Sequence, residues 1–448
     1  MIHPRRQRMF VFGLCLCSCA IGMATAHNDT FPYTLVRDAT TAAKALVEVY
    51  TSSDAQLVDE ELTQPTVRHR ATQDDGSLIL VAGGIDFLPD QSRTGHTLAW
   101  LMDRSGTVKH AWEYDPHLWN DVERVKTVPL KSSFYPVGLH LEADGDLLVN
   151  FQGKDTWPYG VGIAKFDRNS QLLWKRELFN HHWFSVGDDG RIFIPSMRLV
   201  DSPYALGPSG AEVRSDDGKV VDDTIMILSP EGELLNEISI LECLIENGLA
   251  GLFQGATDEN LHAFTSDPVH LNDVRVVTAN DAAQHGLLTV GDLLISFRSL
   301  NAIGLLDPAT RQFKWLATGV GLRQHSPRVH DGGILLLDNR GGTPETGGSQ
   351  LVRVEFDRPG AAAVFPSSRS KPLEHPFYTQ VAGHIDLGPG STSLVTLTAP
   401  GEIWEVDLSS GEVLWDYVYV DPRTHAHKPL YTAKYVHDVA FPLNLEQK

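Results

Sequence analysis

Cysteine is scarce in this sequence. It occurs four times in 448 residues, and Cys15, Cys17 and Cys19 all fall within the first 26 positions. Only Cys243 remains in the rest of the chain, which excludes a framework of internal disulfides there. The apolar segment around Cys243 favours a helix with this thiol in the core. The fold must therefore be held together by packing and backbone hydrogen bonds.

Positive charge and long apolar runs are also in short supply. The formal net charge is −20, which argues against nucleic acid or an anionic membrane surface as a partner. Residues 9–23 form the one extended apolar run, and it is short for a membrane span. The sequence has neither a Gly-rich phosphate loop followed by a helix nor a G-x-S-x-G motif, which argues against a P-loop site and a serine hydrolase.

The first 26 residues have the pattern of a secretory signal peptide. Arg5, Arg6 and Arg8 precede the apolar run, and the small residues at 24–26 fit cleavage. We expect an exported, periplasmic protein without an integral membrane segment after cleavage. A lipid-anchored form is the alternative, because residues 16–19 loosely resemble a lipobox. Residues 27–75 are expected to follow as a short helical and irregular segment, with the helix near residues 42–47.

From residue 76 onward, a unit of short apolar strands recurs six times. In the second half of each unit, a polar turn residue is followed by a large apolar one. The turn residues are Asp103, Asp167, Ser229, Asp307, Asp357 and Asp407, and the apolar residues are Trp112, Trp174, Leu235, Trp315, Phe365 and Trp415. Asp-Gly pairs at 144–145, 189–190 and 331–332 predict hairpins in the first half. Six antiparallel four-stranded units predict an all-β fold, a six-bladed β-propeller over residues 76–448.

The repeated Asp and Trp residues are interpreted as scaffold, because residues that recur in every unit serve turn closure and packing between blades. The first unit lacks an inner strand of its own. Residues 433–440, near the C-terminus, are predicted to supply it and close the ring, which removes exposed sheet edges. Residues 66–71 are the alternative donor.

Polar residues gather on two adjacent segments of the fourth unit. His270 and Asn272 lie two residues apart on one expected strand, and Ser296 and Arg298 lie two apart on the next. Strand alternation would place each pair on one face. A core needs no such pairs, whereas the planar fork of an Arg guanidinium suits sulfate, phosphate or carboxylate. The segments therefore predict a pocket for an anion.

Histidines fall in or near the expected inner strands of several blades. They are His140, His181, His182, His270, His325 and His384. Inner strands of a propeller converge on one axis, so residues far apart in sequence meet there. Histidine clusters suit zinc or copper, but an adjacent Arg298 would repel a cation. We therefore expect no metal and no cofactor.

Five short motifs occur in order within residues 180–339. They are His181-His182, His270-Leu-Asn272, Ile295-Ser-Phe-Arg298, Gln324-His325 and Leu336-Leu-Asp-Asn339. On this ordered set the sequence resembles the bacterial arylsulfotransferases (aryl-sulfate sulfotransferases), which are exported six-bladed propellers. The resemblance implies transfer of a sulfuryl group from a phenolic sulfate ester to a phenolic acceptor, by a ping-pong mechanism through a sulfohistidine and without a nucleotide sulfate donor.

The resemblance also implies a role for individual residues. His325 would be the nucleophile, His270, Asn272 and Arg298 would hold the sulfuryl oxygens, and His182 would assist proton transfer. His181 and Trp183 would complete the substrate site. Trp183 stands where the family usually has a carboxylate, which leaves open whether His181 or His182 is the working residue. Trp183 either stacks on an aromatic ring or packs, and packing is the default.

The implied partners are small molecules, namely an aryl sulfate donor and a phenolic acceptor, and the oligomeric state is not indicated. Two other functions remain open from the sequence. The first is a non-catalytic propeller that binds an anionic or aromatic ligand. The second is a quinoprotein-like dehydrogenase, because Asp- and Trp-containing turns also mark that repeat.

Overall fold

The computed structural model describes residues 18, 22, 62, 64–70, 76–83, 97–115, 117–123, 134–153, 160–205, 212–213, 218–252, 269–340, 348–358, 360–421 and 425–444. The chain divides into two compact units, Met1–Val58 and Asp59–Lys448. The expected helix near residues 42–47, and the expected signal peptide apart from residues 18 and 22, lie outside the described residues. The fold below is that of the second unit.

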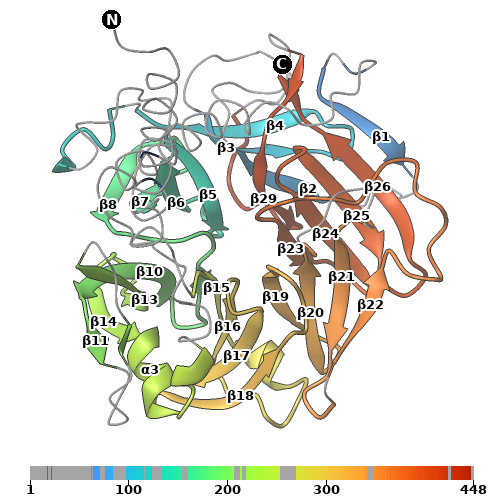
Figure 1. Ribbon diagram of the computed structural model, residues 1–448. Coiled ribbons are helices and arrows are strands. Elements are labelled where there is room, and N and C mark those ends of the chain that lie inside the picture. The colour runs from blue at the N-terminus through green and yellow to red at the C-terminus, as the bar shows by residue number, and fades with distance from the viewer. Residues whose placement is uncertain are drawn as a thin grey trace, which may run out of the picture. The chain divides into compact units, whose positions relative to one another are not determined.

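Six antiparallel sheets form the blades of a β-propeller, as the repeats predict (Figure 1). Blade one contains β29 (Leu430–Val436), β2 (Leu78–Gly83), β3 (Thr97–Met102) and β4 (Val108–Glu113). Blade two contains β5 (Phe134–Leu141), β6 (Leu147–Gly153), β7 (Gly160–Phe166) and β8 (Leu172–Glu177). Blade three contains β9 (Ser185–Val186), β10 (Ile192–Asp201), β13 (Lys219–Leu228) and β14 (Leu234–Ser239).

The second half of the ring continues in the same order. Blade four contains β15 (Leu271–Val276), β16 (Leu293–Phe297), β17 (Ala302–Asp307) and β18 (Gln312–Thr318). Blade five contains β19 (His325–His330), β20 (Gly333–Asp338), β21 (Gln350–Val354) and β22 (Ala361–Phe365). Blade six contains β23 (His384–Leu387), β24 (Thr392–Leu397), β25 (Glu402–Asp407), β26 (Glu412–Val418) and, at its outer edge, β1 (Thr66–Arg70).

Short elements decorate this ring. Two small ribbons pair β11 (Tyr204–Ala205) with β12 (Glu212–Val213), and β27 (Val420–Asp421) with β28 (Ala426–His427). Helix α3 (Ile240–Glu246) follows blade three, with Ser239 as its N-cap, and it buries Cys243 as the sequence predicts. Helix α5 (Ala279–Ala282) lies between β15 and β16. No helix among the described residues is long and apolar enough to cross a membrane.

The strand that closes the ring is β29, near the C-terminus. It pairs with β2 from Leu78↔Val436 to Gly83↔Leu430, so the prediction that this segment completes blade one is confirmed. The alternative donor, β1, pairs instead with β26 on the outside of blade six. Residues from the segment expected to be helical or irregular thus contribute a strand to the propeller. Both early and late parts of the chain contribute strands to the ring.

The repeated Asp and Trp residues act as the scaffold interpretation predicts. The carboxylate of Asp407 accepts hydrogen bonds from Ser409 N and Ser410 N at 2.7 and 3.1 Å, and Asp103 closes its turn through Ser105 N and Thr107 N. Trp415 donates its Nε1 hydrogen to Arg104 O in the next blade, and Trp315 donates likewise to Phe356 O. Residues of the repeat thus close several turns and join blade six to blade one and blade four to blade five.

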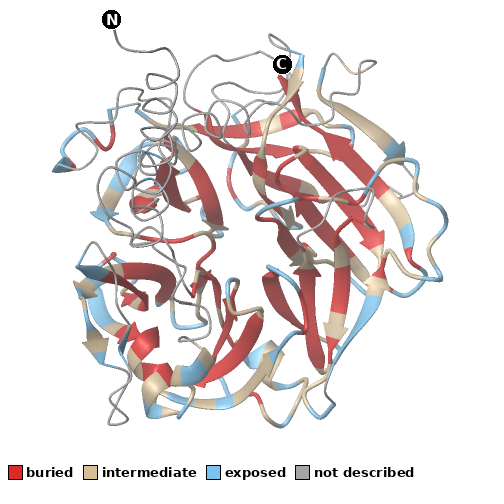
Figure 2. Ribbon diagram, viewed as in Figure 1, coloured by how far each residue is buried: buried red, intermediate tan, exposed pale blue. Residues whose placement is uncertain are grey.

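The buried face of each blade packs against its neighbours, and exposed residues gather on the outer strands (Figure 2). β3 is buried along its whole length, whereas the outer strand β8 has no buried residue. The inner strands β5, β29, β23, β19, β15 and β9 contact one another in ring order. Polar residues on these inner strands can therefore meet around one axis.

Candidate functional site

Four predicted catalytic residues come together where the inner strands begin. His182 precedes β9, His270 precedes β15, His325 opens β19, and Arg298 follows β16. The ring centroid of His182 lies 5.6 Å from that of His270 and 5.9 Å from that of His325. The positive charge of Arg298 acts on both His182 and His325. These four residues are called the histidine cluster below.

The backbone, rather than strand alternation, places His270 beside Arg298. His270 lies just outside β15 with φ of 54°, in a region that non-glycine residues rarely adopt. The register of β15 on β16 also shifts between Leu271 and Asp273, so strand alternation does not set the direction of the His270 side chain. Arg298 N donates to His270 O at 3.0 Å, and this backbone bond holds the two residues side by side. Such backbone strain is concentrated at functional sites in proteins.

His325 is the buried member of the cluster and its tautomer is fixed. Its side chain is 1% exposed, and Nδ1 lies 2.7 Å from Asn339 Oδ1. Asn339 donates its amide hydrogens to Thr379 O and Ala382 O, so its oxygen must accept from His325 Nδ1–H. His325 Nε2 is therefore the nitrogen with a lone pair. It is buried, and within the described residues it has no hydrogen-bond partner.

The backbone around His325 is tied to both neighbouring blades. Asn272 Nδ2 donates to Gln324 O at 2.8 Å, and the amide of Gln324 in turn donates to Ala302 O at 2.9 Å. On the other side, the hydroxyl of Ser326 accepts from Ile385 N at 2.8 Å. Ser326 has φ of 55°, a second strained position in the site. One amide hydrogen of Asn272 is thus used to hold the loop that carries His325.

The predicted pair His181-His182 is positioned by two amides of β6. Asn150 Nδ2 donates to His181 O at 2.7 Å and to His182 O at 2.5 Å. Gln152 Nε2 lies 3.0 Å from His182 Nδ1. An amide nitrogen donates, so Nδ1 accepts and the hydrogen of the neutral imidazole sits on Nε2. His182 is partly exposed whereas His181 is fully buried, which favours His182 as the residue that meets a substrate.

Both His182 and His325 are held neutral. Burial lowers the pKa of His325 to about 3, against the Asn339 hydrogen bond, and the charges of Arg298 and His270 lower it further. Burial, the imidazoles of His181, His270 and His325, and the Arg298 charge hold the pKa of His182 well below its usual value. A neutral imidazole offers a lone pair for attack without a separate base.

Trp183 packs, as its default interpretation has it. Its side chain is 2% exposed, and Nε1 donates to Thr432 Oγ1 on β29 at 2.9 Å. Its ring lies 5.9 Å from that of His325 and 5.7 Å from that of His384. The tryptophan therefore forms one wall of the site and links the closing strand to the residue that holds the lone pair.

Comparison with known families agrees with this geometry. The family described as Arylsulfotransferase (ASST) matches residues 139–419, more than half of the chain. The chain belongs to the arylsulfotransferase family. The matched range contains all seven predicted site residues, which are His181, His182, Trp183, His270, Asn272, Arg298 and His325. A sulfotransferase-type function therefore has support from the family as well as from the site.

Other comparisons are less informative about this arylsulfotransferase family member. No curated protein matches the sequence. A Bacteroides caccae protein of unknown function is 11% identical, covers 81% of this chain and 99% of its own, and has a TM-score of 0.46. A streptogramin B lyase is 11% identical over 83% of this chain and 87% of its own, with a TM-score of 0.40. Likenesses this weak carry no argument about function.

Two residues that orient the histidines have no role assigned from the sequence. Asn339 belongs to one of the motifs, and it lies opposite His325 across the β19–β20 hairpin, in which His325 pairs with Leu337. The hairpin register could have identified it. Gln152 gives no such signal, because the contact between β6 and the segment before β9 joins different blades.

Three imidazoles of the arylsulfotransferase site are close enough to share an ion. The ligand nitrogens of His181, His182 and His270 all lie within 4.8 Å of one another. A metal ion on His182 would disturb its hydrogen bond with Gln152 and the tautomer that this bond sets. The positive charge of Arg298, which acts on His182, also opposes a cation there. The arrangement can also present donors to an anion, which agrees with the sequence expectation. That no metal is needed stays a prediction.

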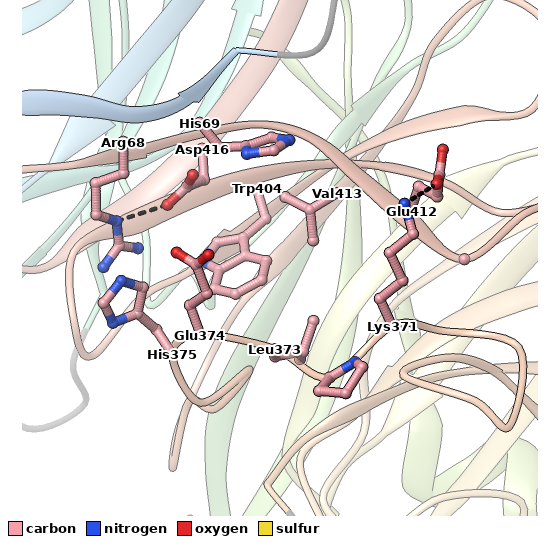
Figure 3. A pocket seen from close by; sticks show the side chains of 12 residues that line it. Arg68, His69, Lys371, Leu373, Glu374, His375, Trp404, Glu412, Val413 and Asp416 are labelled. Atoms are coloured by element: carbon pink, nitrogen blue, oxygen red, sulfur yellow. Dashed lines mark hydrogen bonds and ion pairs between the residues drawn. The ribbon is translucent and has the colours of Figure 1, made fainter.

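A separate cavity of about 310 Å³ lies at the outer edge of blade six (Figure 3). It is lined by β1, by β26 and by residues 371–375, so it lies on the far side of the blade from the inner strand β23. Its charges are largely paired, with Arg68 on Asp416 at 2.6 Å and Lys371 on Glu412 at 2.6 Å. It contains none of the predicted site residues.

Proposed function

We propose that the protein transfers the sulfuryl group of an aryl sulfate to a phenolic acceptor in two steps, through a sulfohistidine at His325. The membership of the arylsulfotransferase family supports the class of reaction. The observation that carries the mechanism is the buried Nε2 of His325, whose lone pair is free while Nδ1–H is bound by Asn339. No nucleotide sulfate donor, cofactor or metal is required.

In the first step, the Nε2 lone pair attacks sulfur and forms an N–S bond as the bond between sulfur and the aryl oxygen breaks. The electron pair leaves on the phenolate oxygen, which takes its proton from water. Sulfonated at Nε2 and protonated at Nδ1, the ring carries a positive charge. Asn339 Oδ1 accepts from Nδ1–H at 2.7 Å and stabilises that charge.

His270 and Arg298 are proposed to bind the sulfuryl oxygens in the transition state. Sulfuryl transfer, like phosphoryl transfer, leaves negative charge on the equatorial oxygens while nucleophile and leaving group lie in line. The guanidinium offers several donors in one plane, and the bond between Arg298 N and His270 O holds both residues in place. Preorganised donors of this kind supply most of the rate.

His182 is proposed to stabilise the phenolate oxygen. Gln152 keeps the hydrogen of His182 on Nε2, which leaves that N–H to donate to the departing oxygen. In the second step, the acceptor phenol gives its proton to water, the resulting phenolate attacks sulfur, the N–S bond breaks, and the electron pair returns to His325 Nε2. His182 then donates to the incoming oxygen. His181 and Asn272 position their neighbours, with Asn272 also close to the sulfuryl site, and Trp183 forms the wall.

Export to the periplasm is proposed as well. The basic, apolar and small-residue pattern of residues 1–26 supports it. Cleavage would leave residues 27–75, and β1 within them, attached to the propeller of residues 76–448.

A single-turnover experiment tests the proposal. The protein is mixed with a chromogenic aryl sulfate and no acceptor, quenched in base, and analysed by mass spectrometry. We expect a burst of one phenol per active site and one added SO₃ group on the peptide that contains His325. Addition of a phenol should remove the adduct and yield the new sulfate ester.

Two variants make the outcome decisive. His325→Ala should show neither burst nor adduct, while His375→Ala, a change at the outer cavity of blade six, should retain both. An adduct on another residue would overturn the assignment of the nucleophile. Ligand-induced stabilisation with no burst in the wild-type protein would instead favour a non-catalytic propeller that binds an anionic or aromatic ligand.

A further inference from the structure

The backbone that carries His325 is irregular, and side chains from both neighbouring blades hold it. Where β19 begins, its register on β20 shifts between His325 and Arg328, and Ser326 has a φ of 55°. A non-glycine residue in this conformation is strained and persists only where the surrounding contacts enforce it. The contacts of residues 324–328 therefore determine where the imidazole of His325 lies.

Two adjacent residues of blade four hold the two ends of this segment. Asn272 Nδ2 donates to Gln324 O at 2.8 Å. At the other end, Asp273 Oδ2 accepts from Arg328 Nη1 at 3.1 Å. Both side chains reach the segment, although neighbouring residues of a regular strand point to opposite faces. The register shift of β15 between Leu271 and Asp273 accompanies this arrangement, so irregular starts of two inner strands are joined to each other.

Blade six holds the same segment from the other side, through the backbone of Ile385. Ile385 N donates to Ser326 Oγ at 2.8 Å, and Ile385 O accepts from Arg328 Nε at 3.0 Å. Arg328 Nη2 lies 3.0 Å from His384 Nε2 and must be the donor, because a guanidinium has no acceptor. Arg328 therefore bonds to both neighbouring blades at once. His384, which the transfer scheme does not use, serves as one of its acceptors.

Arg328 and Asp273 form a buried ion pair, with side chains 5% and 2% exposed. A pair of this kind adds little net stability, because the cost of taking two charges out of water offsets their attraction. A guanidinium does impose direction, since its planar fork bonds only to acceptors that are aligned with it. Asp273 also forms a β-bridge with Trp183, the wall beside His325. The pair is therefore better explained by the positions that it fixes than by stability.

We propose that Arg328 and Asp273 are positioning residues for His325. They hold the backbone of residues 325–328 and thereby fix the place of His325 Nε2 relative to the sulfur atom. The inference rests on the proposed sulfuryl transfer and adds to it two charged residues that no step of the transfer uses. A displacement of about 1 Å in a reacting group can cost about 10²-fold in rate. Loss of the pair should therefore slow the attack on sulfur and leave substrate affinity nearly unchanged.

A double variant that leaves no unpaired buried charge tests this role. Asp273→Leu with Arg328→Met replaces the pair by apolar side chains, so the protein should fold and keep its Tm within about 5 °C of wild type. With a chromogenic aryl sulfate and no acceptor, the rate constant of the burst should fall by about 10–100-fold. The aryl sulfate concentration that gives the half-maximal burst rate should change by less than about threefold, since His270 and Arg298 remain.

The matched control is the buried ion pair of Arg104 and Glu405. Its side chains are 9% and 2% exposed, and Arg104 Nη1 lies 2.6 Å from Glu405 Oε2. Arg104 follows β3 and Glu405 lies on β25, so neither residue belongs to an inner strand. Arg104→Met with Glu405→Leu should keep the burst rate within about twofold of wild type. Equal losses of burst rate in the two double variants would overturn the inference, because any buried pair would then have the same effect.

The position of His325 can also be observed without turnover. In protein labelled with ¹⁵N-histidine, His325 Nδ1–H, which is bound by Asn339 at 2.7 Å, should give a slowly exchanging proton resonance that His325→Ala lacks. This resonance should shift or broaden in Asp273→Leu with Arg328→Met and stay unchanged in the control pair. If the wild-type protein gives no burst, sulfuryl transfer is wrong as its function, and the resonance still decides whether the pair positions His325.

Arg328→Lys provides a second variant if the double variant does not fold. A lysine keeps the positive charge beside Asp273 but cannot reproduce the planar fork that also bonds to Ile385 O and His384. The burst rate should fall by about 10-fold, with the same shift of the His325 resonance. The inference is overturned if a folded variant keeps the wild-type burst rate or, where the wild-type protein gives no burst, the wild-type resonance.

Discussion

The outer hairpins and the beginnings of the inner strands follow different rules in this propeller. Several outer hairpins share one arrangement, in which a turn residue such as Asp407 binds backbone N–H groups and a residue such as Trp415 reaches the next blade. At the beginnings of the inner strands the side chains differ from blade to blade, although β5, β15, β19 and β29 all have a register shift there. His270 and Ser326 have left-handed backbone conformations, and the registers of β15 and β19 shift beside them.

This difference indicates which parts serve stability and which serve chemistry. A residue that recurs in six blades is explained by the scaffold. A buried His325 with an unsatisfied Nε2 is a cost that the scaffold does not need. Substitutions in the two regions should therefore separate activity from stability, and the predictions below run from the largest expected effect to the smallest.

His325→Ala should give the largest loss. Removal of the proposed nucleophile should lower the rate of aryl sulfate turnover by roughly 10⁴-fold or more, because the proposed covalent route passes through His325 Nε2. The fold should persist, since the change leaves the Gln324 and Ser326 bonds in place. Steady-state kinetics and circular dichroism measure the two properties. Wild-type turnover in this variant would show that His325 is not the nucleophile and that the beginnings of the inner strands are not set apart by chemistry.

Arg298→Gln should give the next largest loss. Loss of the guanidinium removes donors from the sulfuryl oxygens in the transition state, which typically costs about 10²–10³-fold in kcat. Arg353→Gln is the matched control, because Arg353 bonds to Glu355 and to backbone carbonyls on blade five, away from the histidine cluster. Equal effects of the two changes on kcat would show that the Arg298 charge acts only on the fold.

Asn339 should act through the tautomer of His325 and not by contact with the substrate. Asn339→Ala should lower kcat by about 10–100-fold, in the range for residues that orient a reacting group. Asn339→Asp keeps an acceptor for Nδ1–H but adds a negative charge, which should raise the pKa of His325. The acid limb of its pH–rate profile should then move to higher pH. If the acid limb of the pH–rate profile does not move in Asn339→Asp, then Asn339 contributes only packing.

The pH dependence of activity and of stability should differ. His325 has a folded pKa of about 3, so the nucleophile stays neutral and turnover should vary little between about pH 8 and 5. Unfolded imidazoles have a pKa near 6.5, so below that pH the unfolded state binds protons that the folded state excludes until about pH 3. Stability should fall across this window, by up to about 1.4 kcal/mol per pH unit for His325.

Urea unfolding and initial rates, measured at several pH values on the same preparation, check that prediction. His325→Ala should weaken the dependence of unfolding free energy on pH between 6.5 and 4. A sharp loss of turnover near pH 6.5 in protein that remains folded would show that a histidine with an ordinary pKa controls the reaction.

Asp407→Ala should have the smallest effect on chemistry. The carboxylate holds Ser409 N and Ser410 N, so its loss should lower the free energy of unfolding by roughly 1–2 kcal/mol. kcat should stay within about twofold of wild type, because the turn lies on the outer hairpin of blade six and makes no contact with the site. Urea titration and steady-state kinetics provide the check. A large loss of kcat would show that the outer hairpins contribute to catalysis as well as to stability.

Much of the fold could be predicted because the scaffold repeats. Asp and Trp at regular intervals indicate six blades, and the unpaired segment near residue 433 indicates the closing strand. The pairing of β15 with β16 and the membership of His182, His270, Arg298 and His325 in one cluster follow from the order of the inner strands. The place of β1 could not be predicted, because an edge strand that pairs only with β26 has no partner in the repeat.

The finer geometry of the site depends on contacts that the sequence repeat does not indicate. Strand alternation fails for His270 because a left-handed residue and a register shift come together there. Gln152 meets His182 across two blades, so no local pattern indicates the contact.

The hydroxyl of Thr432 on β29 donates to Val137 O, and it accepts the N–H of Trp183, the wall beside His325. The ribosome makes β29 about 250 residues after Trp183, so the reactive imidazole lacks its supported wall until translation of the ring is nearly complete. A nascent or truncated chain therefore holds an open blade and an unfinished site at the same time. The site is therefore complete only when the final strand of the ring has joined blade one.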